Sequence, residues 1–192
     1  MAQYNDKQLV ILESVIRLME EGVDLRDLKA ADIAEAAGIG KGTLYLYFSS
    51  KEDIILQALL HRLDVQVEQM VRWGKFQVVG HLTLPLRYFN EMRGFHTSFD
   101  PYEEQIREIL KTLIENGRGI ELNCNRGNQP LPDGKWLKIY RELGGEIITL
   151  GTDAHSTQHV GCSVRERQAL LKSCGFTRFC TFEKQKPIWH AL

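Results

Sequence analysis

The sequence predicts an all-α front joined to an α/β rear, two fold classes within one chain of 192 residues. Two observations support this prediction. Up to about residue 72, apolar residues recur every three or four positions, which is the spacing of amphipathic helices. After Gly74, short apolar runs alternate with longer helical patterns, which is typical of βα units around a parallel sheet. The join between the two parts is therefore expected within residues 60–72.

The composition is ordinary for a globular protein, with 43% hydrophobic and 26% charged residues. The formal net charge of −1 excludes a strongly basic nucleic-acid-binding coat but allows a local basic patch. No apolar run approaches the length of about 18 residues that a membrane span needs. The first 22 residues carry charges throughout, and the four cysteines contain no C-x-x-C pair. We therefore expect a cytoplasmic protein with reduced thiols and no membrane partner.

The front contains four predicted helices. Residues from Leu12 to Met19 place apolar side chains at i, i+3, i+4 and i+7, and Gly22 is a typical C-terminal stop. Ser49 and Glu52 have the spacing of a capping box, which predicts the start of the fourth helix. The second and third helices are predicted at residues 30–37 and 41–48, and the fourth is predicted to run from the capping box to residue 70 or 73.

Residues 31–50 have the pattern of a helix-turn-helix. Ala34 is the small residue needed where two short helices touch, and Gly38 tolerates the positive φ of a sharp turn. Four apolar residues can tie the second helix to the core: Ile33, Ile39, Leu44 and Phe48. A helical packing unit without DNA is the alternative, which the 7 basic against 10 acidic side chains of residues 1–63 slightly favour.

The stretch DIAEAAGIGKGTLYLYFSSKED, residues 32–53, resembles the signature of the tetracycline-repressor (TetR) family of bacterial transcription regulators. The resemblance covers roughly residues 8–63 and implies a DNA-binding domain over residues 1–63, with the third helix in the major groove. It implies DNA as the partner, with a palindromic operator if the chain dimerises. Carried over by position, the residues that contact bases or phosphates are Lys41, Thr43, Tyr45, Tyr47 and Lys51. The family's all-helical C-terminal effector and dimer domain has no counterpart after residue 75.

The rear is predicted to contain about four parallel strands. Each strand is a short apolar run, and helical patterns separate the runs. The predicted strands are residues 76–82, 119–124, 146–151 and 176–182, and the predicted helices are residues 102–116, 135–143 and 164–173.

Polar side chains lie near or just after the C-terminal ends of three of these strands. His81 lies near the C-terminal end of the first strand, and Asp153 and His155 follow the third. Because Asp153 and His155 are two residues apart, they point the same way on an extended segment, and a carboxylate beside an imidazole suits a divalent transition metal. Glu121 and Asn123 are candidates for lining the same site. A hydrogen-bonded scaffold role for His81, and loop capping for Glu121 and Asn123, are the alternatives.

Residues 65–192 resemble the C-terminal half of histidinol phosphatases of the polymerase-and-histidinol-phosphatase (PHP) superfamily. The stretches that carry the resemblance are WGKFQVVGHLTLPLRYF, GRGIELNCNRG, EIITLGTDAHSTQHVG and FTRFCTFEKQKP. The resemblance implies half of a distorted (βα)7 barrel, with His81, Asp153 and His155 as metal ligands and Glu121 and Asn123 near the site. If active, such a domain is a metal-dependent phosphoric monoester hydrolase that acts on a phosphorylated small molecule, L-histidinol phosphate.

The rear departs from that family in its ligand set. The family's His-x-His motif near the N-terminus is missing, and His61 is the only histidine before His81. Three ligands can hold one Zn, Mn or Fe ion but not a cluster. We therefore expect a chimera whose front binds DNA and whose truncated rear is inactive, with metal-dependent hydrolysis, or no function at all, as alternatives. Because a partial barrel leaves strand edges open, self-association is expected.

Overall fold

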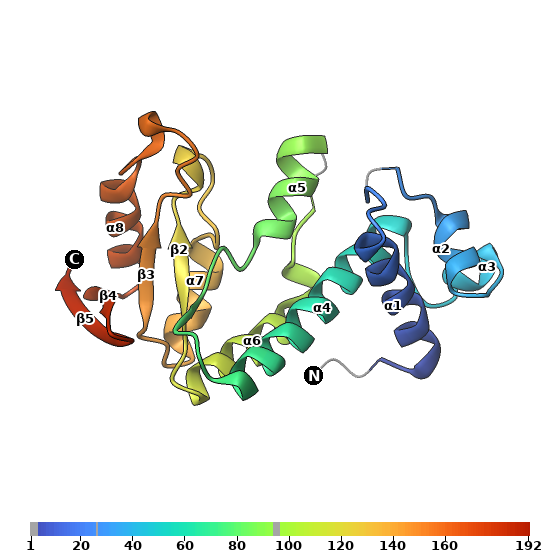
Figure 1. The fold of residues 1–192 in the computed structure, drawn as a ribbon, viewed down its shortest axis with the longest axis horizontal. Helices are drawn as coiled ribbons and strands as arrows, with labels where there is room; N and C mark the ends of the chain where they lie inside the picture. The colour runs from blue at the N-terminus through green and yellow to red at the C-terminus, as the bar shows by residue number, and fades with distance from the viewer. Residues whose placement is uncertain (1–3, 26, 94–96) are drawn as a thin grey trace. The chain divides into compact units, whose positions relative to one another are not determined.

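The computed structural model describes residues 4–25, 27–93 and 97–192 and divides into two compact units. The front unit is Met1–Val67 and the rear unit is Glu68–Leu192. The boundary falls inside helix α4 (Lys51–Trp73), which is continuous across it (Figure 1). In the described residues, no helix combines the length and the apolar character that a membrane crossing requires.

The front unit is helical and contains a helix-turn-helix. Ala34 is 3% exposed, and Gly38 has a φ of +67° at the turn, as expected for a tight turn between two helices. The turn is closed by the backbone N–H of Ile39, which donates to the carbonyl of Ala34 at 2.9 Å. The helices of this unit before α4 are α1 (Asp6–Glu20), α2 (Ala30–Ala36) and α3 (Lys41–Leu44).

Two details of the front differ from the sequence prediction. Helix α3 ends at Leu44 and continues as a turn, because the chain bends to bury Phe48, which is 4% exposed. The cap of α4 lies one residue later than predicted. Its hydroxyl acceptor is Ser50 Oγ, which receives the N–H of Asp53 at 3.0 Å, while the Asp53 carboxylate accepts from the N–H of Ser49 at 2.7 Å.

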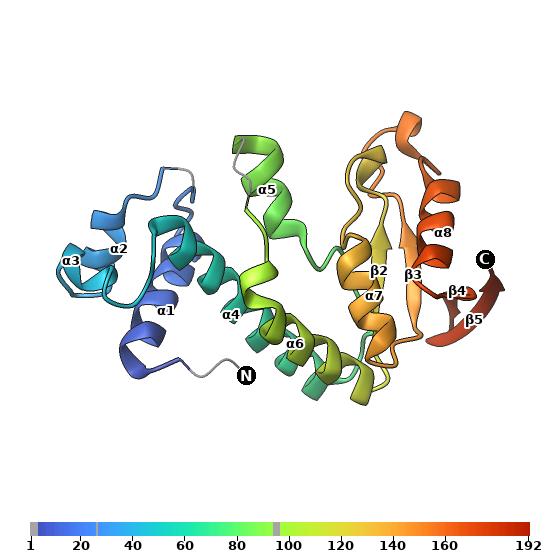
Figure 2. The ribbon, with the colours of Figure 1, turned by 180° about the vertical axis from the view of Figure 1, so that it is seen from behind.

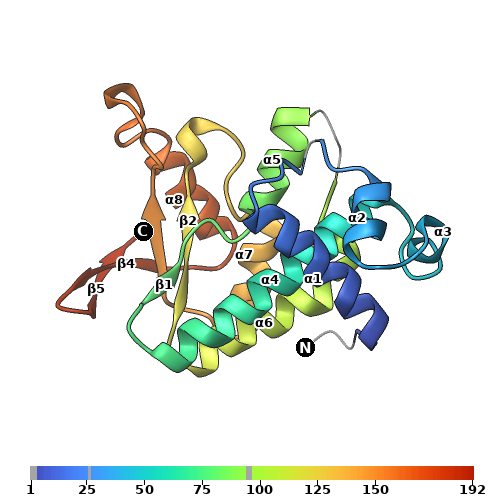
Figure 3. The same ribbon diagram turned by 45° about the vertical axis from the view of Figure 1, so that its right-hand side comes forward.

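The rear unit contains a parallel sheet of three strands in the order β1-β2-β3. Helices α7 and α8 lie on one face of this sheet (Figures 2 and 3). Ile120 and Leu122 of β2 and Ile148 of β3 have no exposed area, because they point to the helix-covered face. The elements are β1 (Val78–Val79), α5 (Leu84–Arg93), α6 (Glu103–Glu115), β2 (Gly119–Asn123), α7 (Gly134–Glu142), β3 (Ile148–Gly151) and α8 (Val164–Ser173).

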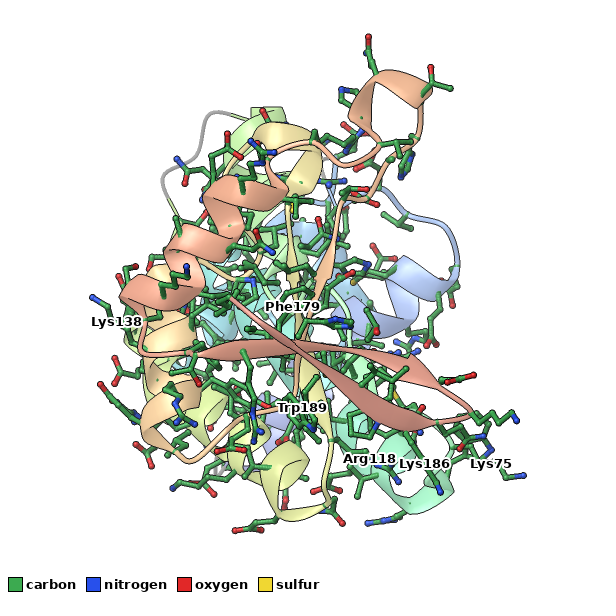
Figure 4. The ribbon with its side chains drawn as sticks, turned by 90° about the vertical axis from the view of Figure 1, so that its left-hand side faces the viewer. Lys75, Arg118, Lys138, Phe179, Lys186 and Trp189 are labelled. Atoms are coloured by element: carbon green, nitrogen blue, oxygen red, sulfur yellow. The ribbon has the colours of Figure 1, made fainter. Side chains whose placement is uncertain are left out.

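The prediction of a fourth parallel strand was wrong. Strand β4 (Arg178–Glu183) pairs antiparallel with β5 (Lys186–Ala191) in a separate two-stranded sheet. The two residues that join them, Lys184 and Gln185, have φ values of +47° and +66°, the conformation of a tight two-residue hairpin turn. Figure 4 labels Phe179 on β4 and Trp189 on β5. Strand β4 still lies against β3, although the two strands belong to different sheets.

Candidate functional site

The candidate DNA-contacting residues lie on α3, on the turn that follows it and at the first position of α4. Lys41 is exposed, Tyr45 is 46% exposed, and Thr43 and Tyr47 are partly exposed. Leu44 and Phe48 alternate with them and are buried. We call the exposed set the recognition surface, and its members are Lys41, Thr43, Tyr45, Tyr47 and Lys51.

The recognition surface combines cations with hydroxyl donors. Lys51 Nζ lies 3.7 Å from Glu52 Oε1, a long contact that leaves the ammonium able to meet another anion. The support beneath the surface comes from α1, where Arg17 Nη2 donates to the carbonyl of Ala36 at 2.6 Å. This bond ties α1 to the end of α2. The arrangement can donate several hydrogen bonds to phosphate oxygens or base edges.

The structure brings together two of the three predicted metal ligands. His155 Nε2 lies 3.2 Å from Asp153 Oδ1. His81, with a φ of +35° just after β1, instead uses its backbone N–H to donate to Glu121 Oε2 at 3.1 Å. Among the residues that the structure describes, no group of three or more His, Cys, Asp or Glu side chains is placed to hold a metal ion.

Two arginines lie close to Asp153. Arg87 Nη1 donates to Asp153 Oδ2 at 3.2 Å and to Asn125 Oδ1 at 3.0 Å, and Arg126 Nε lies 3.9 Å from the same Oδ2. Burial raises the pKa of Asp153, but the hydrogen bonds from His155 and Arg87 outweigh this effect and leave the pKa below its ordinary value. Because both carboxylate oxygens are engaged and two cations lie nearby, these residues as placed do not fit a metal ion.

Glu121 and Asn123 join the ends of the three parallel strands. Asn123 Nδ2 donates to Glu121 Oε2 at 3.1 Å, and Asn123 Oδ1 accepts from the N–H of Asn125 at 2.7 Å. Gly151, at the end of β3, leaves the space that the Glu121 carboxylate fills, because a Cβ there would overlap it. Glu121 and Asn123 therefore brace the strand ends next to Asp153.

Sequence reasoning did not find Arg87, Asn125 and Arg126. Arg87 lies on α5, a helix that was not predicted, and it meets Asp153 from 66 positions away in the chain. Asn125 and Arg126 have positive φ values of +48° and +54° in the loop after β2. A signal was present for Asn125, because Asn tolerates the left-handed region, but none marked Arg87.

Comparisons with known proteins find two distinct likenesses. The model of the family "Bacterial regulatory proteins, tetR family" matches residues 11–58. An HTH-type transcriptional regulator of Staphylococcus aureus is 42% identical over 140 residues, which cover 62% of this chain and 72% of that protein. A probable histidinol-phosphatase of Thermotoga maritima is 32% identical over 105 residues, which cover 53% of this chain.

A solved structure shares the fold over a large part of the chain. The histidinol phosphate phosphatase of Lactococcus lactis, crystallised with zinc, L-histidinol and phosphate, has a TM-score of 0.56 and 25% identity over 75% of this chain. This chain spans 54% of that structure and 42% of the Thermotoga relative. The comparisons thus describe a chain that is TetR-like in front and histidinol-phosphatase-like behind.

Proposed function

Because the chain belongs to the tetR family of bacterial regulatory proteins, we propose that its front unit binds DNA through α2 and α3 as a transcription regulator. The observation that carries the proposal is the alternation at α3. Leu44 and Phe48 are buried at 0% and 4% exposure, while the hydrogen-bond donors between them face solvent. A packing unit without a ligand has no need of a cation and several hydroxyls on one short exposed segment.

Each member of the recognition surface has a proposed role. Lys41 and Thr43 contact base edges or nearby phosphates from the start of α3. Tyr45 and Tyr47 donate hydrogen bonds from their phenol O–H groups to phosphate oxygens. Lys51 pairs with a further phosphate at the start of α4. The partner is a palindromic operator bound by two copies of the chain, because one copy with two lysines binds weakly and with strong salt dependence. A regulator of this kind works in the cytoplasm, where the DNA is.

The test begins with selection of bound sequences from a random DNA pool, followed by fluorescence anisotropy with the selected operator. Lys41→Ala is expected to weaken binding by roughly ten-fold and to reduce the salt slope by about 1. Lys7→Ala, which removes an exposed lysine of α1, is the matched control and should leave the affinity unchanged. Failure of the unaltered protein to bind any DNA at about 50 mM salt would contradict the proposal.

A second candidate function is hydrolysis of a phosphomonoester by the rear unit, which its likeness to proteins named histidinol-phosphatases suggests. We propose that the rear unit does not catalyse this reaction. Asp153 is held by Arg87 and His155, and the described residues contain no third ligand beside it. A full metal cluster would also need ligands that the family carries in the half without a counterpart here.

Phosphate release from L-histidinol phosphate tests this second proposal. The unaltered protein and Asp153→Asn are compared with added Mn²⁺ or Zn²⁺. Equal release from both proteins, at the level of buffer with metal, is the expected result. Release by the unaltered protein that disappears in Asp153→Asn would show that the rear unit is an enzyme.

A further inference from the structure

Leu46 is an exposed apolar side chain within the recognition surface. Its exposed fraction is 78%, the highest among the large exposed hydrophobic residues in the described part of the chain. Its backbone N–H donates to the carbonyl of Thr43 at 3.2 Å, which holds it in the turn after α3. The core positions on either side are filled by Leu44 and Phe48, so Leu46 is held outward by its place in the turn.

The surroundings of Leu46 narrow the class of ligand. Tyr45 and Tyr47 flank it in the chain, and Thr43 accepts its backbone N–H, so its neighbours suit a polyanion with hydrogen-bond acceptors. A phosphate-binding surface alone gains nothing from a leucine at its centre. A protein partner usually covers a contiguous apolar patch, whereas Leu46 stands among polar groups.

The major groove offers one apolar group to such a side chain. Base-pair edges there present donors and acceptors, and thymine adds its C5-methyl group. Burying the exposed part of a leucine side chain against a methyl group removes apolar area from water and is favourable. A leucine surrounded by hydrogen-bond donors that suit phosphate therefore matches the chemistry of a thymine edge, which lies between the two sugar-phosphate backbones of the groove.

We propose that Leu46 is a specificity-determining residue that selects thymine at one position of each operator half-site by contact with the C5-methyl group. The inference rests on DNA binding by the front unit, as proposed above. It adds a base preference that Tyr45, Tyr47 and Lys51 cannot supply, because their contacts with phosphate carry no sequence information.

The experiment replaces each thymine of the selected operator, one at a time, with uracil, which keeps base pairing and lacks only the methyl group. Affinities are measured by fluorescence anisotropy for the unaltered protein, Leu46→Ala and Lys51→Ala. At one position per half-site, uracil should weaken the unaltered protein roughly three- to ten-fold. The same replacement should leave the affinity of Leu46→Ala unchanged, while Lys51→Ala, weaker overall, keeps the full response to uracil.

The outcomes separate this inference from the proposed function. If the protein binds no DNA, both fail. If it binds, but no uracil position affects the unaltered protein more than Leu46→Ala, the role of Leu46 is overturned while DNA binding stands. Because Leu46 is 78% exposed, its replacement should not unfold the domain, which circular dichroism checks. Leu46→Met, which keeps an apolar side chain, should retain the response to uracil and serves as the second variant.

Discussion

Arg87 forms a partly buried ion pair with Asp153. Its side chain is 12% exposed, and the Asp153 side chain is 22% exposed, so their ion pair is partly shielded from water. A carboxylate in such a place needs a partner, because an unpaired charge away from water is costly. The guanidinium supplies that partner, and Asn125 fixes the guanidinium in turn.

The pairing of Arg87 with Asp153 can be measured by a double-mutant cycle. Arg87→Met, Asp153→Asn and the double variant are unfolded in urea at neutral pH. We expect a coupling free energy of about 1 kcal/mol, because the two groups are in contact and partly buried. The exposed pair of Arg72 and Glu68, 3.5 Å apart, is the matched control and should couple by less than about 0.5 kcal/mol. Equal coupling free energies in the two pairs would mean that partial burial does not strengthen the interaction of Arg87 with Asp153.

Lys135 gives a prediction of pH dependence. Its ammonium lies 2.5 Å from Asp100 Oδ1 and 2.9 Å from Glu103 Oε2, and these hydrogen bonds lower the pKa values of both carboxyls. A lowered pKa contributes stability above the ordinary carboxyl pKa, and this stability is lost as the pH falls through the lowered value. Lys135→Met should therefore lower the melting temperature slightly at pH 7, and this difference should shrink as the pH falls below the ordinary carboxyl pKa of about 4.

Lys138→Met, an exposed lysine on the same helix, is the control for that experiment, and calorimetry at several pH values is the measurement. It should not reproduce the pH-dependent difference. A Lys135→Met deficit that is constant from pH 7 to pH 2 would mean that packing of the side chain on Trp136, 4.6 Å from the ring centroid, is the cause.

At the level of elements, the sequence pattern predicted most helices and four of the strands, although the fourth is not parallel, and the misses have physical causes. Periodic apolar residues mark α1, α4 and α6 because each buries one face. Strand β5 has mostly exposed side chains on both faces, so it gives no alternating signal. The turn before it adopts positive φ without Gly or Asn, so the hairpin had no sequence signature.

The candidate site divides in the same way. The closeness of Asp153 and His155 was predicted, but its geometry was not: the prediction assumed an extended segment, whereas Asp153 has a φ of +51° and the chain turns there. The contact of Asp153 with Arg87 depends on the long-range packing of α5, which periodicity does not encode. The bond from the Asn125 N–H to Asn123 Oδ1 matches the loop-capping alternative. The place of Glu121 beside Gly151 was hidden, because it depends on the parallel register that sets Asn123 opposite Gly151.

That register leads to a prediction for Gly119, the first residue of β2. A Cβ at this position would overlap the carbonyl oxygen of Ile147, a backbone atom that cannot move without shifting β3. Gly119→Ala should therefore destabilise the protein by about 1–3 kcal/mol in urea unfolding. Gly42→Ala is the control, since nothing lies within 4 Å of its added Cβ, and it should be neutral or slightly stabilising. Equal stability of the two variants would show that the backbone at Ile147 can move away from the added Cβ at little cost in free energy.

The chain joins a part that is similar to transcription regulators to a part that is similar to histidinol phosphatases, and each similarity covers only part of the chain. The regulator likeness covers 62% of the chain and the phosphatase fold likeness covers 75%, so the two overlap. The boundary between residues 67 and 68 lies within the continuous helix α4, so the helical spacing of apolar residues continues from the front unit into the rear unit. A chimera joined within a helix keeps its local hydrogen bonds, whereas a join within a strand would also have to preserve its pairing.

The incomplete rear unit also leads to a prediction of self-association. In the described residues β5 pairs only with β4, so its other edge is open, and two apolar side chains of this strand, Ile188 and Trp189, are 41% and 36% exposed. Figure 4 shows Trp189 at the surface of this hairpin. With a net charge of −1, little repulsion opposes contact between copies. Sedimentation velocity should show association that rises with protein concentration in the micromolar range.

Trp189→Lys should shift that association to several-fold higher concentration, because it removes apolar area and adds a charge to an open edge. Val160→Lys makes the same change at a residue 72% exposed in the loop after β3 and should leave association unchanged. Equal weakening by both variants would point to net charge as the cause, and a strictly monomeric unaltered protein would refute the prediction. Because two copies are needed to span a palindrome, loss of association in Trp189→Lys with unchanged operator affinity would place the DNA-binding dimer elsewhere.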